Sequence, residues 1–210
     1  DGLIGTHGIL PFPAYLAERA SEPWWRTPTL FWWWQTDAAL HTALATGCLL
    51  AGALVLGVRV QGPLLLGLWA IYLSLSQVGQ AFLSFQWDTL LVETLFASLF
   101  IARWQTREDR APSRVGVWIL RWTLFKLMLA SGLVKLTSGD PTWWDGSAMA
   151  FHYWTQPIPN PVSWYAHHLP AWFHRLETWA TLFIEIVLPF AIFAGRPGRR
   201  VALVGFTLVL

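Results

Sequence analysis

The chain has 210 residues, of which 55% are hydrophobic and only 12% are charged, and its formal net charge at pH 7 is +2. A soluble domain usually carries about a quarter charged residues, so this balance excludes an ordinary soluble protein and indicates lipid as the solvent. The small net charge gives no indication of nucleic-acid binding, and the single cysteine, Cys48, excludes an intrachain disulfide and a cysteine-based zinc site.

Six hydrophobic segments have the composition of transmembrane helices, which need about 20 mostly apolar residues each to cross a bilayer. In chain order they cover residues 37–57, 63–85, 87–102, 115–136 and 176–194, and a last one begins near residue 199. The 16 tryptophans suit such a protein, because Trp favours the membrane–water interface. We therefore predict an all-α fold, a polytopic bundle of about six transmembrane helices that forms a single domain over residues 1–210.

Arginines predict the orientation, because Lys and Arg are enriched in short cytosolic loops. Four arginines lie in the loop 103–114, three lie after the fifth segment, and Arg59 follows the first. These loops share one face if the six segments alternate. The long segments 1–36 and 137–175 then share the opposite, exoplasmic face. A chain that starts on that face predicts a further helix upstream and, with the last segment cut short, a further region downstream.

Ionisable side chains inside the predicted helices are candidates for function, because burying one is costly unless it is paired. Glu93 and Lys126 each lie about three helical turns from the loop 103–114, so they should meet at similar depth. We predict a structural Glu93–Lys126 ion pair. Lys135, at the exoplasmic end of the fourth segment, is open to two interpretations: a cation favoured by the helix dipole, or a desolvated base.

The exoplasmic loop 137–175 is rich in Trp, His and Pro, and its prolines forbid one continuous helix. Its histidines lack an HExxH spacing, so we predict no metal site, and the absence of GxSxG, Walker and GxGxxG motifs gives no indication of a cofactor. Functional candidates gather here and at the start of the third segment. They are Lys135, Asp140, His152, Gln156 and Trp164, with Gln86 and Asp88 on the same face.

Four stretches carry a family resemblance. They are LIGTHGILPFPAYL (3–16), YLSLSQVGQAFLSFQWDTLLVET (72–94), LRWTLFKLMLASGLVKLTSGDPTWW (120–144) and FHYWTQPIPNPVSWYAHHLPAWFHR (151–175). The chain closely resembles the lipase maturation factor family. The resemblance implies a membrane protein that, in animals, lies in the endoplasmic reticulum and helps secreted lipases fold and assemble into active dimers. In a bacterium, the equivalent membrane would be the plasma membrane facing the periplasm.

A more distant similarity links the residues around Lys135 to the membrane domain of vitamin K-dependent gamma-carboxylase. Lys135, Leu136, Asp140 and the turn 143–146 look like the segment that carries that enzyme's catalytic lysine, although the spacing from lysine to aspartate is longer here. Three functions therefore stay open. The first is a maturation factor whose partners are membrane lipid and a secreted lipase or other exported protein. The second is a membrane enzyme with Lys135 as base and an apolar, quinone-like cofactor, and the third is a lipid-binding scaffold.

Overall fold

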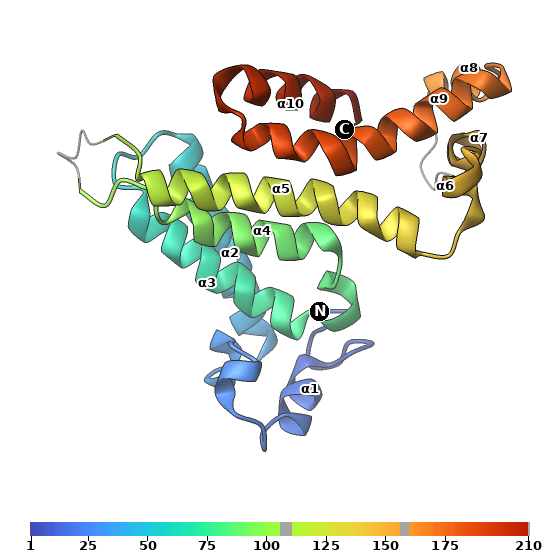
Figure 1. Cartoon of the computed structure of the whole chain (residues 1–210). Helices are drawn as coiled ribbons and strands as arrows, with labels where there is room; N and C mark the ends of the chain where they lie inside the picture. The colour runs from blue at the N-terminus through green and yellow to red at the C-terminus, as the bar shows by residue number, and fades with distance from the viewer. Residues whose placement is uncertain (106–110, 156–159, 210) are drawn as a thin grey trace. The chain divides into compact units, whose positions relative to one another are not determined.

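The computed structural model describes residues 1–105, 111–155 and 160–209. Every regular element in these ranges is a helix, which confirms the all-α class for the described part of the chain (Figure 1). The α-helices are α1 Phe12–Glu18, α2 Asp37–Val55, α3 Gly62–Val78, α4 Gln86–Ser98, α5 Arg114–Thr137, α6 Pro141–Asp145, α7 Ala148–Thr155, α8 Pro161–His167, α9 Ala171–Leu182 and α10 Gly195–Val209. The short 3-10 and π turns are η1 Trp24–Arg26, η2 Leu30–Trp32, η3 Gln80–Leu83, η4 Phe183–Val187 and η5 Leu188–Phe193.

Three of these helical runs are long and apolar enough to cross a bilayer. They are Asp37–Val55, Arg114–Thr137 and Ala171–Phe193, the last joining α9, η4 and η5, and a shorter apolar helix covers Gly62–Val78. These four runs coincide with the first, fourth, fifth and second predicted segments. The third segment is occupied by α4, whose 13 residues are fewer than the roughly 20 that span a bilayer. The sixth is occupied by α10, which runs to the last described residue, Val209.

The chain divides into two compact units, Asp1–Thr123 and Leu124–Leu210. The first unit is built around α3, which packs against α2 on one side and α4 on another and also contacts α1 and η2. Its buried core is formed by side chains from these elements, namely Phe12, Leu16, Phe31, Leu40, Leu75 and Val78. The N-terminal segment is therefore packed onto the helices rather than extended.

Hydrogen bonds fix the position of η2 on α3 in the first unit. The hydroxyl of Ser74 accepts from the backbone N–H of Leu30 at 3.0 Å, and the hydroxyl of Thr29 donates to the Ser74 carbonyl at 3.2 Å. Thr29 also caps η2 by accepting from the N–H of Phe31. The aromatic segment that precedes α2 is thus held at a defined place beside the first turns of that helix.

The second unit packs α10 against η4 and η5 and holds α7 between α8 and α9. Its apolar core joins the part of α5 after Thr123 to η5 and α10, and consists of Phe125, Met128, Leu188, Ile192, Ala202 and Phe206. Polar side chains gather in this unit where α5 faces η4 and where α7 faces α9. These two clusters are the most distinctive chemical features of the described residues.

Candidate functional site

A partly buried ion pair joins Lys135 of α5 to Glu185 of η4. The ammonium Nζ lies 2.7 Å from Oε1 and 2.6 Å from Oε2, so both carboxylate oxygens accept from the same nitrogen. The Glu185 side chain is only 7% exposed and that of Lys135 is 25% exposed. Nζ also lies 5.4 Å from the centre of the Trp143 ring, in the geometry of a cation–π contact. The lysine charge is therefore compensated by a carboxylate and an aromatic face.

The helix around Glu185 is irregular, and Pro189 supplies a physical reason. A proline inside a helix has no N–H to donate, and its ring clashes with the carbonyl four residues earlier, which here is that of Glu185. The chain responds with one π turn, in which the N–H of Leu188 donates to the carbonyl of Phe183, followed by the 3-10 turn η5. Single π turns inside helices recur at functional sites.

A glycine brings α5 close enough for the pair to form. A Cβ added to Gly132 would lie 2.5 Å from Cγ1 of Ile186 and 3.0 Å from Cβ of Glu185, so no larger residue fits without displacement. Small residues serve this purpose between membrane helices, where they permit close backbone approach. Lys135 lies three residues further along α5 and hence on the same face of the helix as Gly132.

The short helix α6 supplies Trp143. The carboxylate of Asp140 accepts from the N–H of Thr142 at 2.9 Å and from its hydroxyl at 2.7 Å, and so caps α6 at its first turn. At the other end Gly146 adopts φ +81°, a left-handed conformation that favours glycine. Asp145 next to it has its pKa lowered by hydrogen bonds from Ser147. These local signals make a tight turn that carries Trp143 back to the end of α5.

A second polar cluster joins α7 to α9. Glu177 accepts from the Tyr153 hydroxyl at 2.6 Å and lies 3.1 Å from Nδ1 of His174, whose Nε2 lies 3.3 Å from the His167 carbonyl. His174 is buried. Burial, together with the hydrogen bond to Glu177, raises the pKa of Tyr153, so its hydroxyl remains a donor at neutral pH.

The hydroxyl of Thr178 completes this cluster. It accepts from the backbone N–H of Met149 at 3.2 Å and donates to the carbonyl of His174 at 2.9 Å, and the residue is fully buried. An α7 backbone donor near the start of the helix is thus satisfied by a side chain of α9. The two helices are joined by specific hydrogen bonds as well as by apolar packing.

In the first unit, Asp88 is buried at the start of α4. One carboxylate oxygen accepts from the Tyr72 hydroxyl of α3 at 2.6 Å, and the other accepts from the backbone N–H of Phe85 at 3.2 Å. Asp88 therefore closes the first turn of α4 and joins it to α3. This position in the first turn also places a negative charge where the helix dipole favours it.

The replacement Tyr72→Phe is expected to lower the stability of the protein by about 1–3 kcal/mol, because Asp88 stays buried and loses a partner. Thermal unfolding of the purified protein in lipid nanodiscs measures the effect. Tyr165→Phe is the matched control, since Tyr165 is 69% exposed. Equal melting temperatures for the two variants would show that the Tyr72–Asp88 bond contributes nothing.

The predicted site residues are carried by different elements of the two units. Asp140 is an exposed helix cap. His152 and Trp164 are exposed on α7 and α8, with their rings against neighbouring aromatic rings. Gln86 is the exposed first residue of α4. Gln156 lies outside the described residues.

Two further predictions concern residues that belong to different units. Glu93 and Lys126 belong to different units, so their predicted ion pair stays a prediction. The same holds for the proposed association of Gln86 and Asp88 with the loop that follows Lys135, because the two groups also belong to different units.

Sequence reasoning placed Lys135 among the candidates but missed its partner and the α7–α9 cluster. Glu185 was recognisable as an acidic residue inside an apolar helix. The additional signal was Pro189 four residues later, which predicts a break in the helix at that carboxylate. The cluster of Tyr153, His174 and Glu177 had a weaker signal, a His and a Glu three residues apart on one helix face.

The chemistry open to these clusters is hydrogen bonding and charge compensation. Among the described residues, no three His, Cys, Asp or Glu side chains are placed to hold a metal ion. The nitrogen of Lys135 points its donors at Glu185, whereas a general base would present its lone pair to a substrate. The arrangement therefore favours helix–helix fastening over proton transfer.

Comparison with known proteins gives a consistent result over nearly the whole chain. A family model described as the lipase maturation factor transmembrane domain matches residues 1–210. Lipase maturation factor 2 of Homo sapiens is 42% identical over 98% of this chain and 32% of its own length, and that of Xenopus laevis is 43% identical over 98% and 31%. Lipase maturation factor 1 of Homo sapiens is 38% identical over 92% and 37%.

The chain thus spans about a third of the length of these relatives. No solved structure shows a significant match.

Proposed function

Because the chain belongs to the lipase maturation factor family, as its resemblance indicated, we propose that it is the membrane-embedded part of a protein that helps secreted lipases, or other exported proteins, to fold and assemble. The observation that carries the proposal is the similarity over nearly all of the chain to proteins named for lipase maturation. The chain is an integral membrane protein, as its apolar helices and the matching transmembrane family indicate.

The proposal includes a topology. Six segments that alternate across the bilayer, as one domain, place the arginine-rich loops on the cytosolic side and residues 1–36 and 137–175 on the exoplasmic side. In a eukaryote this side would be the lumen of the endoplasmic reticulum, and in a bacterium it would be the periplasm. Exported clients fold in these compartments, so the helices α6 to α8 would lie where a client can reach them.

Exposed aromatic side chains on these helices support a contact surface. Five large side chains on α7, α8 and the start of α9 are between 45% and 69% exposed, namely Phe151, Trp154, Trp164, Tyr165 and Trp172. Aromatic residues of this kind suit the membrane interface and also the recognition of apolar segments. The α7–α9 hydrogen bonds would hold this surface in a fixed shape.

In this proposal Lys135 fastens two helices. Its nitrogen is engaged by Glu185, with the Trp143 ring nearby, which supports a structural role over that of a base in a carboxylase-like enzyme. A lysine held in this way keeps α5 against the irregular turn η4. Loss of the pair would therefore disturb the exoplasmic end of α5, from which α6 and the aromatic surface follow.

The test is to express the full-length protein with a secreted lipase in cells that lack a maturation factor of their own. Secreted lipase activity per lipase molecule is the measurement. We expect the wild type to raise this specific activity, Lys135→Ala to abolish most of the gain, and Asp140→Ala to have a smaller effect, since an exposed cap contributes about 1 kcal/mol.

Glu22→Ala is the control, because the Glu22 salt bridges with Arg19 and Arg26 are solvent-accessible and contribute little. A wild type that leaves lipase specific activity unchanged at normal membrane abundance would contradict the proposed function.

A further inference from the structure

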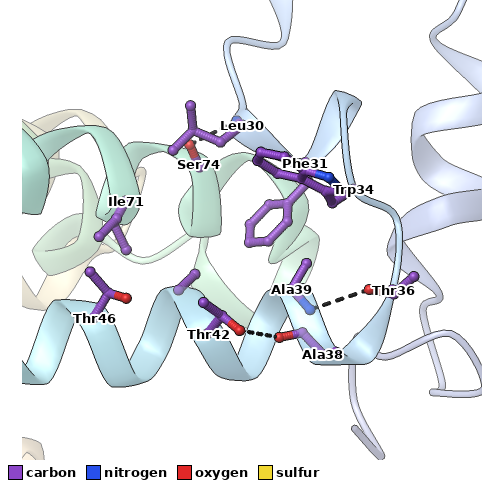
Figure 2. A pocket seen from close by; sticks show the side chains of 11 residues that line it. Leu30, Phe31, Trp34, Thr36, Ala38, Ala39, Thr42, Thr46, Ile71 and Ser74 are labelled. Carbon is purple, nitrogen blue, oxygen red and sulfur yellow. Dashed lines mark hydrogen bonds between the residues drawn. The ribbon is translucent and has the colours of Figure 1, made fainter.

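A groove of about 450 Å³ lies in the first unit between the start of α2, the turn η2 and α3. Figure 2 shows the residues that form it: the segment with Leu30, Phe31 and Trp34 covers one side, and α2 forms the floor. From α2 the groove is lined by Thr36, Ala38, Ala39, Thr42, Ala43 and Thr46. Its volume lies within the range of about 300–1,000 Å³ that is typical of sites for small ligands.

Three hydroxyls that line the groove form hydrogen bonds within the protein. Thr36 accepts from the N–H of Ala39 at 3.3 Å, and Thr42 donates to the carbonyl of Ala38 at 2.7 Å, as Figure 2 shows. Ser74 accepts from the N–H of Leu30 and donates to the carbonyl of Ala70 at 2.6 Å. Apart from the Thr46 hydroxyl and the Trp34 indole N–H, the groove presents mainly methyl groups and aromatic rings, so it suits an apolar chain better than water, which needs two to four polar partners.

The groove lies at one end of a helix that is long enough to cross the bilayer. Thr36 is the N-cap of α2, and the neighbouring Trp33 and Trp34 are 70% and 69% exposed. Exposed tryptophans next to the end of an apolar helix mark the level of the lipid headgroups. The groove therefore begins at this level and continues toward the hydrocarbon region along α2.

The open side of the groove is continuous with the lipid-facing surface of α2. Ala38, Thr42 and Thr46 follow each other at intervals of four residues, so they form one stripe of small side chains along the helix. Leu44 and Leu49 of the same helix are 52% and 75% exposed, and little of α2 is buried. Lipid chains therefore contact α2 on the faces that α3 leaves open, and we place the stripe as a recess in that surface.

We propose that one acyl chain of a bilayer phospholipid occupies this groove, with its ester end beside Trp34 and its methylene groups along the stripe of small residues. A recess left empty loses dispersion contacts on both of its walls, and a lipid chain that enters it restores them. Transfer from bulk lipid brings no hydrophobic gain, so packing alone sets the preference for the groove. The inference rests on α2 as a membrane span and does not depend on the proposed function.

The test uses the full-length protein in nanodiscs that contain a phosphatidylcholine with a diazirine in one acyl chain. After photolysis, peptide mapping by mass spectrometry compares labelling of the groove residues with that of Leu44 and Leu49. We expect labelling to concentrate on Trp34, Thr42 and Thr46. Thr42→Phe fills the groove and should lower labelling of Trp34 about fivefold, which corresponds to roughly 1 kcal/mol of packing.

Ala45→Phe is the matched control, since Ala45 is exposed on the same helix and does not line the groove. If Thr42→Phe does not accumulate, Ala38→Phe fills the same space from an exposed position one turn earlier. Even labelling along all exposed residues of α2 would overturn the proposal. Equal losses of Trp34 labelling in Thr42→Phe and Ala45→Phe would also overturn it. So would labelling of the groove by a diazirine fatty acid but not by the phospholipid.

Discussion

The replacement Glu185→Leu alone should lower the free energy of unfolding by about 2–4 kcal/mol, somewhat less than the roughly 3–5 kcal/mol for a fully buried pair, because the Lys135 side chain that loses its partner is 25% exposed. Lys135 would then keep its ammonium at the end of α5, beside the Trp143 ring and the Ser131 carbonyl. Membrane abundance should fall accordingly, because a loss of this size is a large fraction of the stability of a protein domain. Thermal unfolding in nanodiscs and immunoblots of membrane fractions measure both effects.

The double variant Lys135→Met/Glu185→Leu should recover most of this loss. An ion pair replaced by apolar residues of similar volume is often neutral or stabilising by about 1–4 kcal/mol, because both charges no longer need to be desolvated. The double-mutant cycle then gives a large coupling energy between the two positions. The double variant could instead lose as much free energy of unfolding as Lys135→Met and Glu185→Leu lose together. That result would mean that the two residues act independently and would contradict the ion pair.

The second large effect is expected for Glu177→Leu. The change removes the acceptor of the Tyr153 hydroxyl and the partner of the buried His174, and each group left without its partner should cost about 1–3 kcal/mol. The result should be the release of α7 from α9 rather than the unfolding of the whole chain. Hydrogen exchange of the amides in Ala148–Thr155 measures this release directly, because local opening exposes them to exchange.

Two variants control this experiment. Glu22→Leu removes an exposed carboxylate and should leave the exchange of α7 unchanged. Thr178→Val keeps the shape of a fully buried side chain but takes away the acceptor for the Met149 N–H, so it should increase exchange at the start of α7 specifically. If Glu177→Leu leaves the exchange of α7 unchanged, the hydrogen-bonded cluster does not hold the two helices together.

Hydropathy predicted the helices of this chain well and their lengths less well. The four segments with the most continuous apolar runs correspond to α2, α3, α5 and the run Ala171–Phe193. The predicted segment 63–85 ended seven residues too late, because α3 stops at Val78 and a separate 3-10 turn follows. Hydropathy measures composition over a window and does not register where backbone hydrogen bonding changes.

The prolines of the segment 137–175 predict that no single helix covers it, and two of them also begin short helices. Pro141 and Pro161 each occupy the first position of a short helix, after Asp140 and Asn160 as N-caps. Proline is favoured at that position, since its missing N–H has no partner there in any helix. An Asp or Asn directly before a Pro was therefore the available signal for α6 and α8.

The Lys135–Glu185 pair shows why part of the candidate site could not be predicted. Matching ionisable residues by their depth in the membrane assumes regular helices. This reasoning predicts the pair Glu93–Lys126, which stays a prediction. The helix that carries Glu185 is not regular, because Pro189 disrupts its hydrogen bonding and a π turn covers Phe183–Val187. On such a turn, the direction of a side chain depends on the local backbone conformation and cannot be predicted from the 3.6-residue period of a regular α-helix.

We propose that the Lys135–Glu185 pair fastens two helices in a protein whose proposed role is the maturation of secreted lipases. The most direct measurement is secreted lipase specific activity in cells that express the full-length Lys135→Met/Glu185→Leu variant at the membrane abundance of the wild type. We predict activity close to that of the wild type, although both charges are gone. Activity at the level of cells without any maturation factor, at equal abundance, would contradict the claim and would assign the charged groups a direct role.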